Sequence, residues 1–176
     1  IAYTPDGAAC VLELNSETDF VARNAIFQEL ALGVARSALG LDAPTTAASA
    51  ELDITSVSQA SLDGKSMADA DVASATSVTE ALGIAVSKLG ENIVLRRACL
   101  LTPPAAGGLV CGYVHNTYAP DVGKTAAAVV LQSAATDVEA LRSLGQKLAM
   151  HVVAASPLFL DRTSVDAAAL ERERAI

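Results

Sequence analysis

The chain has 176 residues, of which 52% are hydrophobic and 18% charged, and its 12 basic and 20 acidic residues give a formal net charge of −8. Disordered chains are less hydrophobic than this, and proteins that bind nucleic acid directly carry basic runs that neutralise phosphates. The composition therefore predicts a folded protein without direct nucleic-acid contact. The apolar runs of the chain are far shorter than the ~20 residues that a membrane span needs.

The first elements are a strand and a helix. Residues Ala9–Asn15 predict a strand that places Cys10, Leu12 and Leu14 on one face and Val11, Glu13 and Asn15 on the other. Ser16 with Asp19 three residues later resembles an acidic capping box, so we expect a helix over Thr18–Leu39, ended by Gly40.

The next segment, residues 41–75, is rich in Ala, Ser, Thr and Asp and shows little periodicity. It is interpreted as a variable, exposed connection with at most one short helix. A helix over Val78–Leu89 follows, closed by Gly90, with Lys88 near the negative end of its dipole.

Three strand-like runs come next: Asn92–Leu101, Gly108–His115 and Thr125–Gln132, the last of which is also compatible with a helix because of its alanines. Residues 116–124 are expected to form a loop, and the short spacing suggests an antiparallel meander. Helices over Asp137–Ala155 and from about Ser164 complete an α+β fold.

The residues offer little for catalysis. Gly123-Lys124-Thr125 resembles the end of a phosphate-binding loop, but Tyr118 stands where that motif needs glycine, so a hairpin turn is favoured. His115 and His151 are the only histidines, and neither accompanies a nucleophile in a glycine-flanked turn. No His, Cys or carboxylate pair has metal-ligand spacing. We therefore expect a protein that is not an enzyme and holds no cofactor or metal.

The cysteines Cys10, Cys99 and Cys111 are odd in number and lack CxxC spacing. This pattern predicts neither a disulfide framework nor a zinc site. Buried free thiols in a reducing compartment are the favoured interpretation.

Asp19 and Phe20 have two interpretations. The pattern alone favours an acidic residue that stabilises the first helical turn, by about 0.3–1 kcal/mol, followed by a core phenylalanine. A phenylalanine that faces solvent at this turn would instead indicate a contact with another protein.

Four segments resemble the elongation factor Ts family. Residues 13–24 contain the family signature ETDFVA, residues 88–97 match its K-[IL]-G-E-N pattern and the following strand, residues 112–115 match its Y-x-H strand end, and residues 149–157 match its AMH segment. The matches occur in the family's order and cover most of the chain outside residues 41–75.

The resemblance implies helices packed on small antiparallel sheets in two similar subdomains, residues 1–104 (with a variable insert at about 41–75) and residues 105–176. Family members usually begin with a small helical domain, and this chain starts after it. Many also continue beyond the point where Ile176 stands, so the second subdomain is expected to be incomplete.

The resemblance also implies a guanine-nucleotide exchange factor that binds elongation factor Tu and promotes release of its GDP. The residues matching Asp19, Phe20 and Val21 would press on the G domain of Tu, and those matching Leu89, Gly90 and His115 would belong to the same contact surface. The alternative is a non-exchanging structural component of a ribosomal complex that keeps the fold. The length of the loop at 116–124 resembles alphaproteobacterial and mitochondrial members, and on that basis the mitochondrial matrix is favoured over the bacterial cytoplasm.

Overall fold

The computed structural model describes residues 1–41, 48–105, 107–134 and 136–174. In chain order its elements are β1 (Ala2–Tyr3), β2 (Ala9–Ser16), α1 (Asp19–Ala22), α2 (Ala25–Ala38), β3 (Ser49–Leu52), α3 (Ile54–Gln59), α4 (Ala70–Ala73), α5 (Val78–Leu89), β4 (Ile93–Leu101), β5 (Gly108–Ala119), β6 (Val122–Gln132), α6 (Val138–Ala155), the 3₁₀ helix η1 (Arg162–Ser164) and α7 (Ala167–Arg174).

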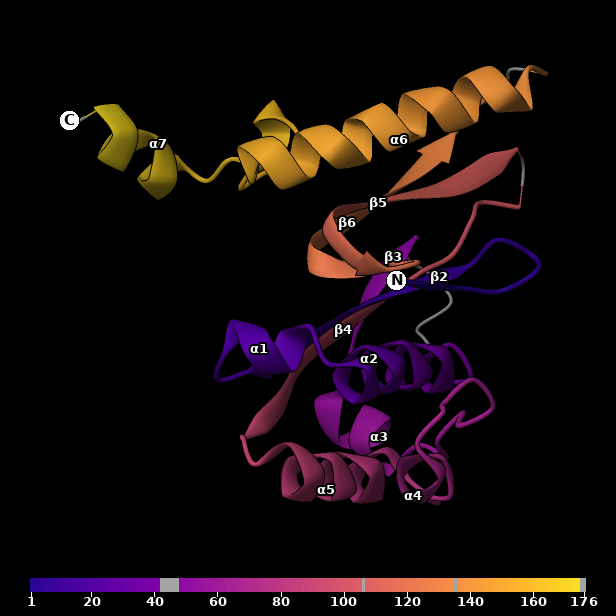
Figure 1. Ribbon diagram of the computed structural model, residues 1–176. Coiled ribbons are helices and arrows are strands. Elements are labelled where there is room, and N and C mark those ends of the chain that lie inside the picture. The colour runs from indigo at the N-terminus through magenta and orange to yellow at the C-terminus, as the bar shows by residue number, and fades with distance from the viewer. Residues whose placement is uncertain (42–47, 106, 135, 175–176) are drawn as a thin grey trace.

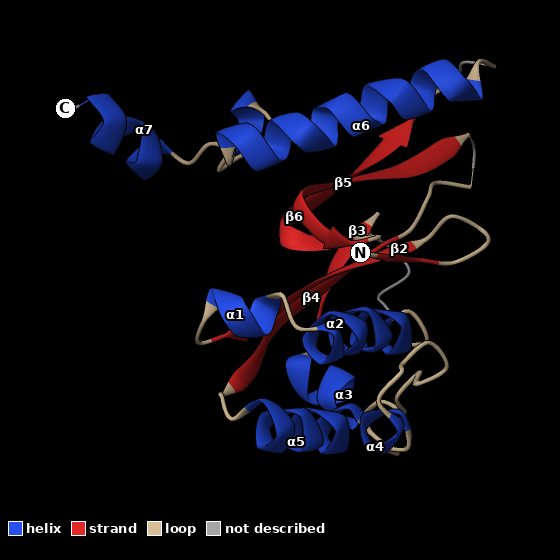
Figure 2. Ribbon diagram, viewed as in Figure 1, coloured by secondary structure: helices blue, strands red, loops and turns tan. Residues whose placement is uncertain are grey.

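The elements form four layers (Figures 1 and 2). A four-stranded antiparallel sheet in the order β1-β2-β4-β3 lies in the middle, and β5 with β6 forms a separate antiparallel hairpin. Helices α2, α3 and α5 cover one face of the larger sheet, the hairpin lies on its other face, and α6 covers the hairpin. The expected α+β fold with small antiparallel sheets is confirmed.

Strand β2 separates two apolar clusters because successive side chains point to opposite faces. Cys10, Leu12 and Leu14 join the larger core beneath the helices. Ala9 and Val11 face the hairpin and join the smaller cluster between the two sheets. The hairpin is thereby held against β2, the strand that leads directly into α1.

The helix expected over Thr18–Leu39 is in fact two helices. The side chain of Thr18 accepts a hydrogen bond from the Val21 amide and caps α1, and the side chain of Asn24 accepts from the Ile26 amide at 2.9 Å and caps α2. Ser16 is the last residue of β2, so the predicted capping box is wrong. The chain breaks here because each cap satisfies free amides at the start of a new helix.

The interpretation of residues 41–75 as an exposed connection is wrong for the part that the structure describes. Residues 48–75 contain β3, α3 and α4, and β3 pairs with β4. Val57 and Val72 are 0% and 1% exposed and belong to the larger core. Residues 42–47 lie outside the described residues.

The three-strand meander is also wrong. Strand β4 pairs with β2 and β3, and not with β5. The prediction failed because these partners lie far from β4 in the sequence. Strand β6 is extended, so the helical alternative fails, and the expected loop at 116–124 is mostly strand. Pro120 and Asp121 alone separate β5 from β6, and Asp121 adopts a φ of 62° that Asp tolerates better than most residues.

Other expectations hold. Helix α5 ends at Gly90 with a left-handed φ of 73°, and α6 agrees with the predicted long helix within one residue. The last helix begins later than expected, at Ala167. The three thiols are free, with Cys10 and Cys111 buried and Cys99 only half-buried.

Candidate functional site

The one-turn helix α1 presents a large apolar side chain, Phe20, to solvent. Phe20 is 86% exposed, whereas the next residue, Val21, is 7% exposed and belongs to the larger core. The interpretation of Phe20 as a core residue is therefore wrong. Val21, together with the partly buried Ala22, attaches α1 to the core, whereas Phe20 faces solvent.

The beginning of α1 is held by a residue from a distant segment. The amide and the hydroxyl of Thr18 donate hydrogen bonds to the two carboxylate oxygens of Glu91, at 3.0 and 2.6 Å. Glu91 directly follows Gly90, whose left-handed conformation turns the chain from α5 toward β4. Glu91 thus joins the end of α5 to the α1 tip, defined as residues 18–20.

The hairpin approaches α1 from its other side. The Lys124 ammonium lies 3.7 Å from a carboxylate oxygen of Asp19, and the Arg23 guanidinium lies 6.0 Å from the centre of the Tyr118 ring. The ion pair is exposed and contributes little stability by itself. A groove of about 680 Å³ runs between these elements, with Asp19 and Ala22 on one side and Tyr118 and Lys124 on the other.

His115 lies on β5, exposed and opposite Thr125 of β6, which is next to Lys124. The Tyr113 hydroxyl lies 3.2 Å from Nδ1 of His115. Neighbouring residues of a strand point to opposite faces, so His115 and Thr125 lie on the face of the hairpin opposite to that of Lys124, the residue that pairs with Asp19.

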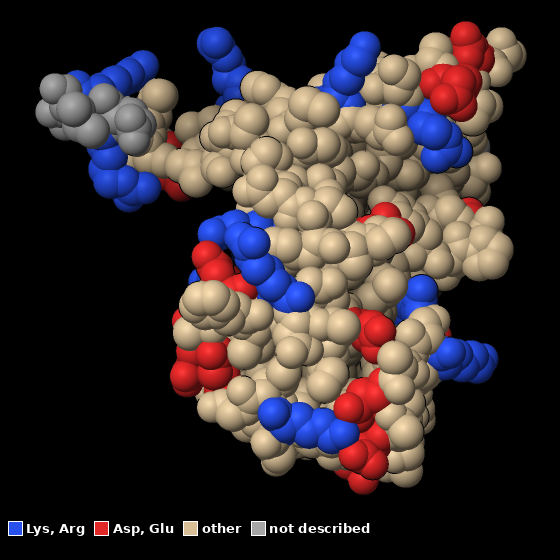
Figure 3. Space-filling view, in the orientation of Figure 1, with Lys and Arg blue, Asp and Glu red and all other residues tan. Residues whose placement is uncertain are grey.

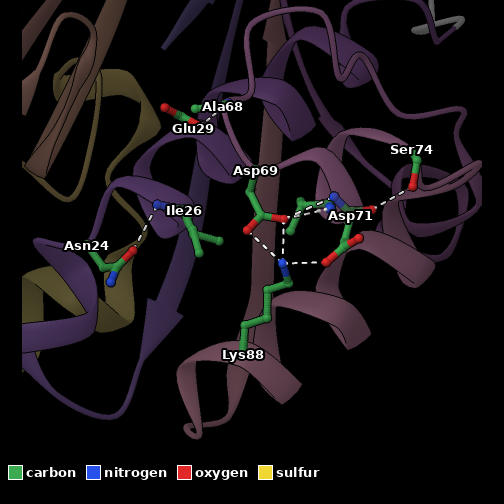
Figure 4. A network of polar contacts seen from close by, with 9 residues as sticks. Asn24, Ile26, Glu29, Ala68, Asp69, Asp71, Ser74 and Lys88 are labelled. Carbon is green, nitrogen blue, oxygen red and sulfur yellow. Dashed lines mark hydrogen bonds and ion pairs between the residues drawn. The ribbon is translucent and has the colours of Figure 1, made fainter.

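Leu89 is half-buried and Gly90 exposed, and a polar network holds the helix that carries them (Figure 4). The Lys88 ammonium lies 2.7 Å from Asp69 and 2.6 Å from Asp71, which belong to the N-terminus of α4. The hydrogen bond from Lys88 lowers the pKa of the Asp69 carboxyl, and the same contact raises the pKa of Lys88. In the same view, the Glu29 carboxylate accepts from the Ala68 amide at 2.8 Å and ties α2 to this segment.

Within residues 1–41, 48–105, 107–134 and 136–174, no three His, Cys, Asp or Glu side chains are grouped so that they could hold a metal ion. Burial raises the pKa of Cys10 to about 12, which keeps its thiol protonated at neutral pH. Among the same residues, no helix combines the length and the apolar character needed to cross a membrane.

Sequence analysis missed three residues of this site: Thr18 as a cap, Glu91 and Lys124. Thr18 had a detectable signal, because Thr is a preferred N-cap residue. Glu91 belongs to the K-[IL]-G-E-N match, but no local pattern shows that Glu91 or Lys124 contacts α1, because each does so only through the pairing of distant strands.

The family model described as elongation factor Ts matches residues 17–176. The chain is 43% identical to elongation factor Ts of Brucella anthropi over 168 residues, and 42% identical to those of Brucella ovis and Brucella canis. Each match covers 96% of this chain and 48% of the relative, so the chain spans about half the length of these bacterial relatives. The chain belongs to the elongation factor Ts family.

Proposed function

We propose that the chain is a guanine-nucleotide exchange factor that binds elongation factor Tu in its GDP form and promotes GDP release. The single observation that carries the proposal is the exposure of Phe20 on an anchored helical turn within the family's signature segment. A free, large apolar side chain on a fixed turn is suited to enter a pocket of another protein. Membership of the elongation factor Ts family supports elongation factor Tu as that protein.

In this proposal Asp19 and Phe20 contact the G domain of elongation factor Tu, and Phe20 inserts between helices beside the nucleotide. Leu89, Gly90 and His115 complete the contact surface. Val21, which was also expected at this surface, is 7% exposed and instead supports α1 from the core. A partner that binds the open, Mg²⁺-depleted GTPase more tightly than the closed one lowers the affinity for GDP by the same factor. No covalent step is needed, so the protein accelerates exchange without being an enzyme.

The test measures release of mant-GDP from a bacterial elongation factor Tu. Burying a Phe side chain contributes about 1.5–3 kcal/mol, so Phe20→Ala is expected to slow stimulated release by about 10-fold or more. Its effect on the unfolding free energy should stay within about 0.5 kcal/mol, because an exposed side chain supports little of the fold.

Leu158→Ala is the matched control, because Leu158 is 85% exposed but lies after α6, outside the site. It should leave release unchanged. Equal rates for the Phe20→Ala variant and the parent chain would refute the assigned role of Phe20. Binding to elongation factor Tu without any acceleration would favour the alternative of a structural component in a ribosomal complex.

The proposal also includes the subdomain bounds, the kind of partner and the cellular location. The two separate sheets support subdomains at residues 1–104 and 105–176. The net charge of −8, and Lys and Arg side chains that lie apart on the face in Figure 3, support contact with protein instead of nucleic acid. The relatives reported above are bacterial, which favours the bacterial cytoplasm and gives the mitochondrial matrix no support.

A further inference from the structure

The beginning of α1 is weakly held by bonds of its own. Helix α1 has four residues, and a helix of one turn is unstable in water without external contacts. The Arg23 and Asn24 amides donate to the carbonyls of Phe20 and Val21 at 3.2 and 2.9 Å and secure the end of the helix. At its beginning the bonds are longer, since the Val21 amide donates to the Thr18 hydroxyl at 3.5 Å and the Ala22 amide donates to the Thr18 carbonyl at 3.4 Å. Both of these bonds depend on where Thr18 is placed.

Thr18 is placed by Glu91. The β2–β4 ladder ends at the pair Ser16 and Ile93, so the chain segments that follow β2 and precede β4 leave the sheet at the same end. There the Glu91 carboxylate accepts from the amide and the hydroxyl of Thr18, a pair of charge-assisted hydrogen bonds across 73 residues of sequence. The Lys124 contact to Asp19 is longer, at 3.7 Å, and more exposed, which makes it the weaker of the two supports.

We propose that Glu91 is a positioning residue for nucleotide exchange: its carboxylate orders Thr18 and thereby α1, so that Phe20 meets the partner already oriented. The proposal rests on the exchange function proposed above. Ordering a side chain and its loop before binding removes an entropic cost that binding would otherwise have to overcome. Glu91 itself needs no contact with the partner.

The first experiment is a double-mutant cycle on mant-GDP release with Phe20→Ala, Glu91→Ala and the combined variant. Glu91→Ala alone removes both hydrogen bonds to Thr18 and should slow release by about tenfold or more, since a hydrogen bond to a charged group contributes about 1.5–3 kcal/mol. In the Phe20→Ala background it should change release by less than about twofold, because the two residues act through one contact. Equal factors in both backgrounds, or no effect of Glu91→Ala, would overturn the proposal.

Two variants separate positioning from charge. Glu91→Gln keeps an acceptor for the Thr18 amide and offers a donor to its hydroxyl, so it should restore release to within about threefold of the parent chain. Glu139→Ala removes an exposed carboxylate from the first turn of α6 and should leave release unchanged. If Glu91→Gln is as slow as Glu91→Ala, positioning through Thr18 is refuted.

Hydrogen exchange supplies a readout that does not depend on elongation factor Tu. Glu91→Ala should speed exchange of the Val21 and Ala22 amides by about tenfold or more, and leave the amides of α6 unaffected. Unchanged hydrogen exchange at the Val21 and Ala22 amides would overturn the proposal even if mant-GDP release slowed. If Glu91→Ala accelerates hydrogen exchange but Phe20→Ala leaves mant-GDP release unchanged, the ordering of α1 by Glu91 stands and the proposed nucleotide-exchange function fails.

Discussion

Two glycines inside long helices should respond in opposite ways to the same substitution. Gly83 in α5 is exposed, and a Cβ built there meets no atom within 4 Å. Gly145 in α6 faces the hairpin, where a Cβ would lie 2.5 Å from Sγ and 2.7 Å from Cβ of Cys111, closer than real carbon contacts. Alanine therefore fits at the first position and forces α6 away from β5 at the second.

The magnitudes follow from two effects. Replacing Gly by Ala in a helix interior stabilises by about 0.8–1 kcal/mol, and this gain is common to both positions. Overpacking costs about 1–3 kcal/mol, and it applies only at Gly145. The difference between the Gly83→Ala and Gly145→Ala variants therefore isolates the packing cost, and Gly145→Ala should be less stable by about 1–3 kcal/mol.

Urea unfolding followed by circular dichroism measures this difference, with the slope of the transition checked to be equal in both variants. The melting temperatures should differ by about 2–4 °C for each kcal/mol at this chain length. Equal stabilisation by the two substitutions would refute the close approach of α6 to the hairpin. It would also remove the support for the hairpin that carries Lys124 and His115.

Three other substitutions test separate features. Gly90→Ala should destabilise by about 1–2 kcal/mol in urea unfolding, because a φ of 73° strains any residue with a Cβ, although no neighbouring atom obstructs it. Val57→Ala should cost about 2 kcal/mol in the same assay, since Val57 is fully buried, and a neutral result would restore the exposed-connection interpretation. Lys88→Met should flatten the loss of stability at acid pH, measured as unfolding free energy from pH 7 to 2. The pKa of Asp69 is lowered from 3.8 by Lys88, so this contribution is present above pH 3.8 and is lost as the pH falls below it.

Local chemistry accounts for the elements that the sequence predicted correctly. The alternation in β2 and the apolar periodicity of α5 and α6 need only neighbouring residues, and Gly90 ends α5 because glycine tolerates positive φ. The break at Asn24 had the same kind of local cause, a preferred capping residue, and was overlooked because the apolar pattern continues across it.

Pairing between distant strands has no such local trace. The segment at 48–75 looks polar and irregular, yet Val57 and Val72 become core residues once β3 joins β4. Strand β4 was assigned to the wrong neighbours because hydrophobic alternation indicates a strand but does not identify its partner.

The sequence alone thus determined the family, through short motifs in a constant order, together with the class of most helices and strands. Only the tertiary structure decided that Phe20 faces solvent and that Glu91 holds Thr18. The physical reason is that exposure and long-range hydrogen bonds depend on which surfaces meet when the sheet assembles. An apolar residue at the start of a helix is equally compatible with a core and with a binding surface until its neighbours are in place.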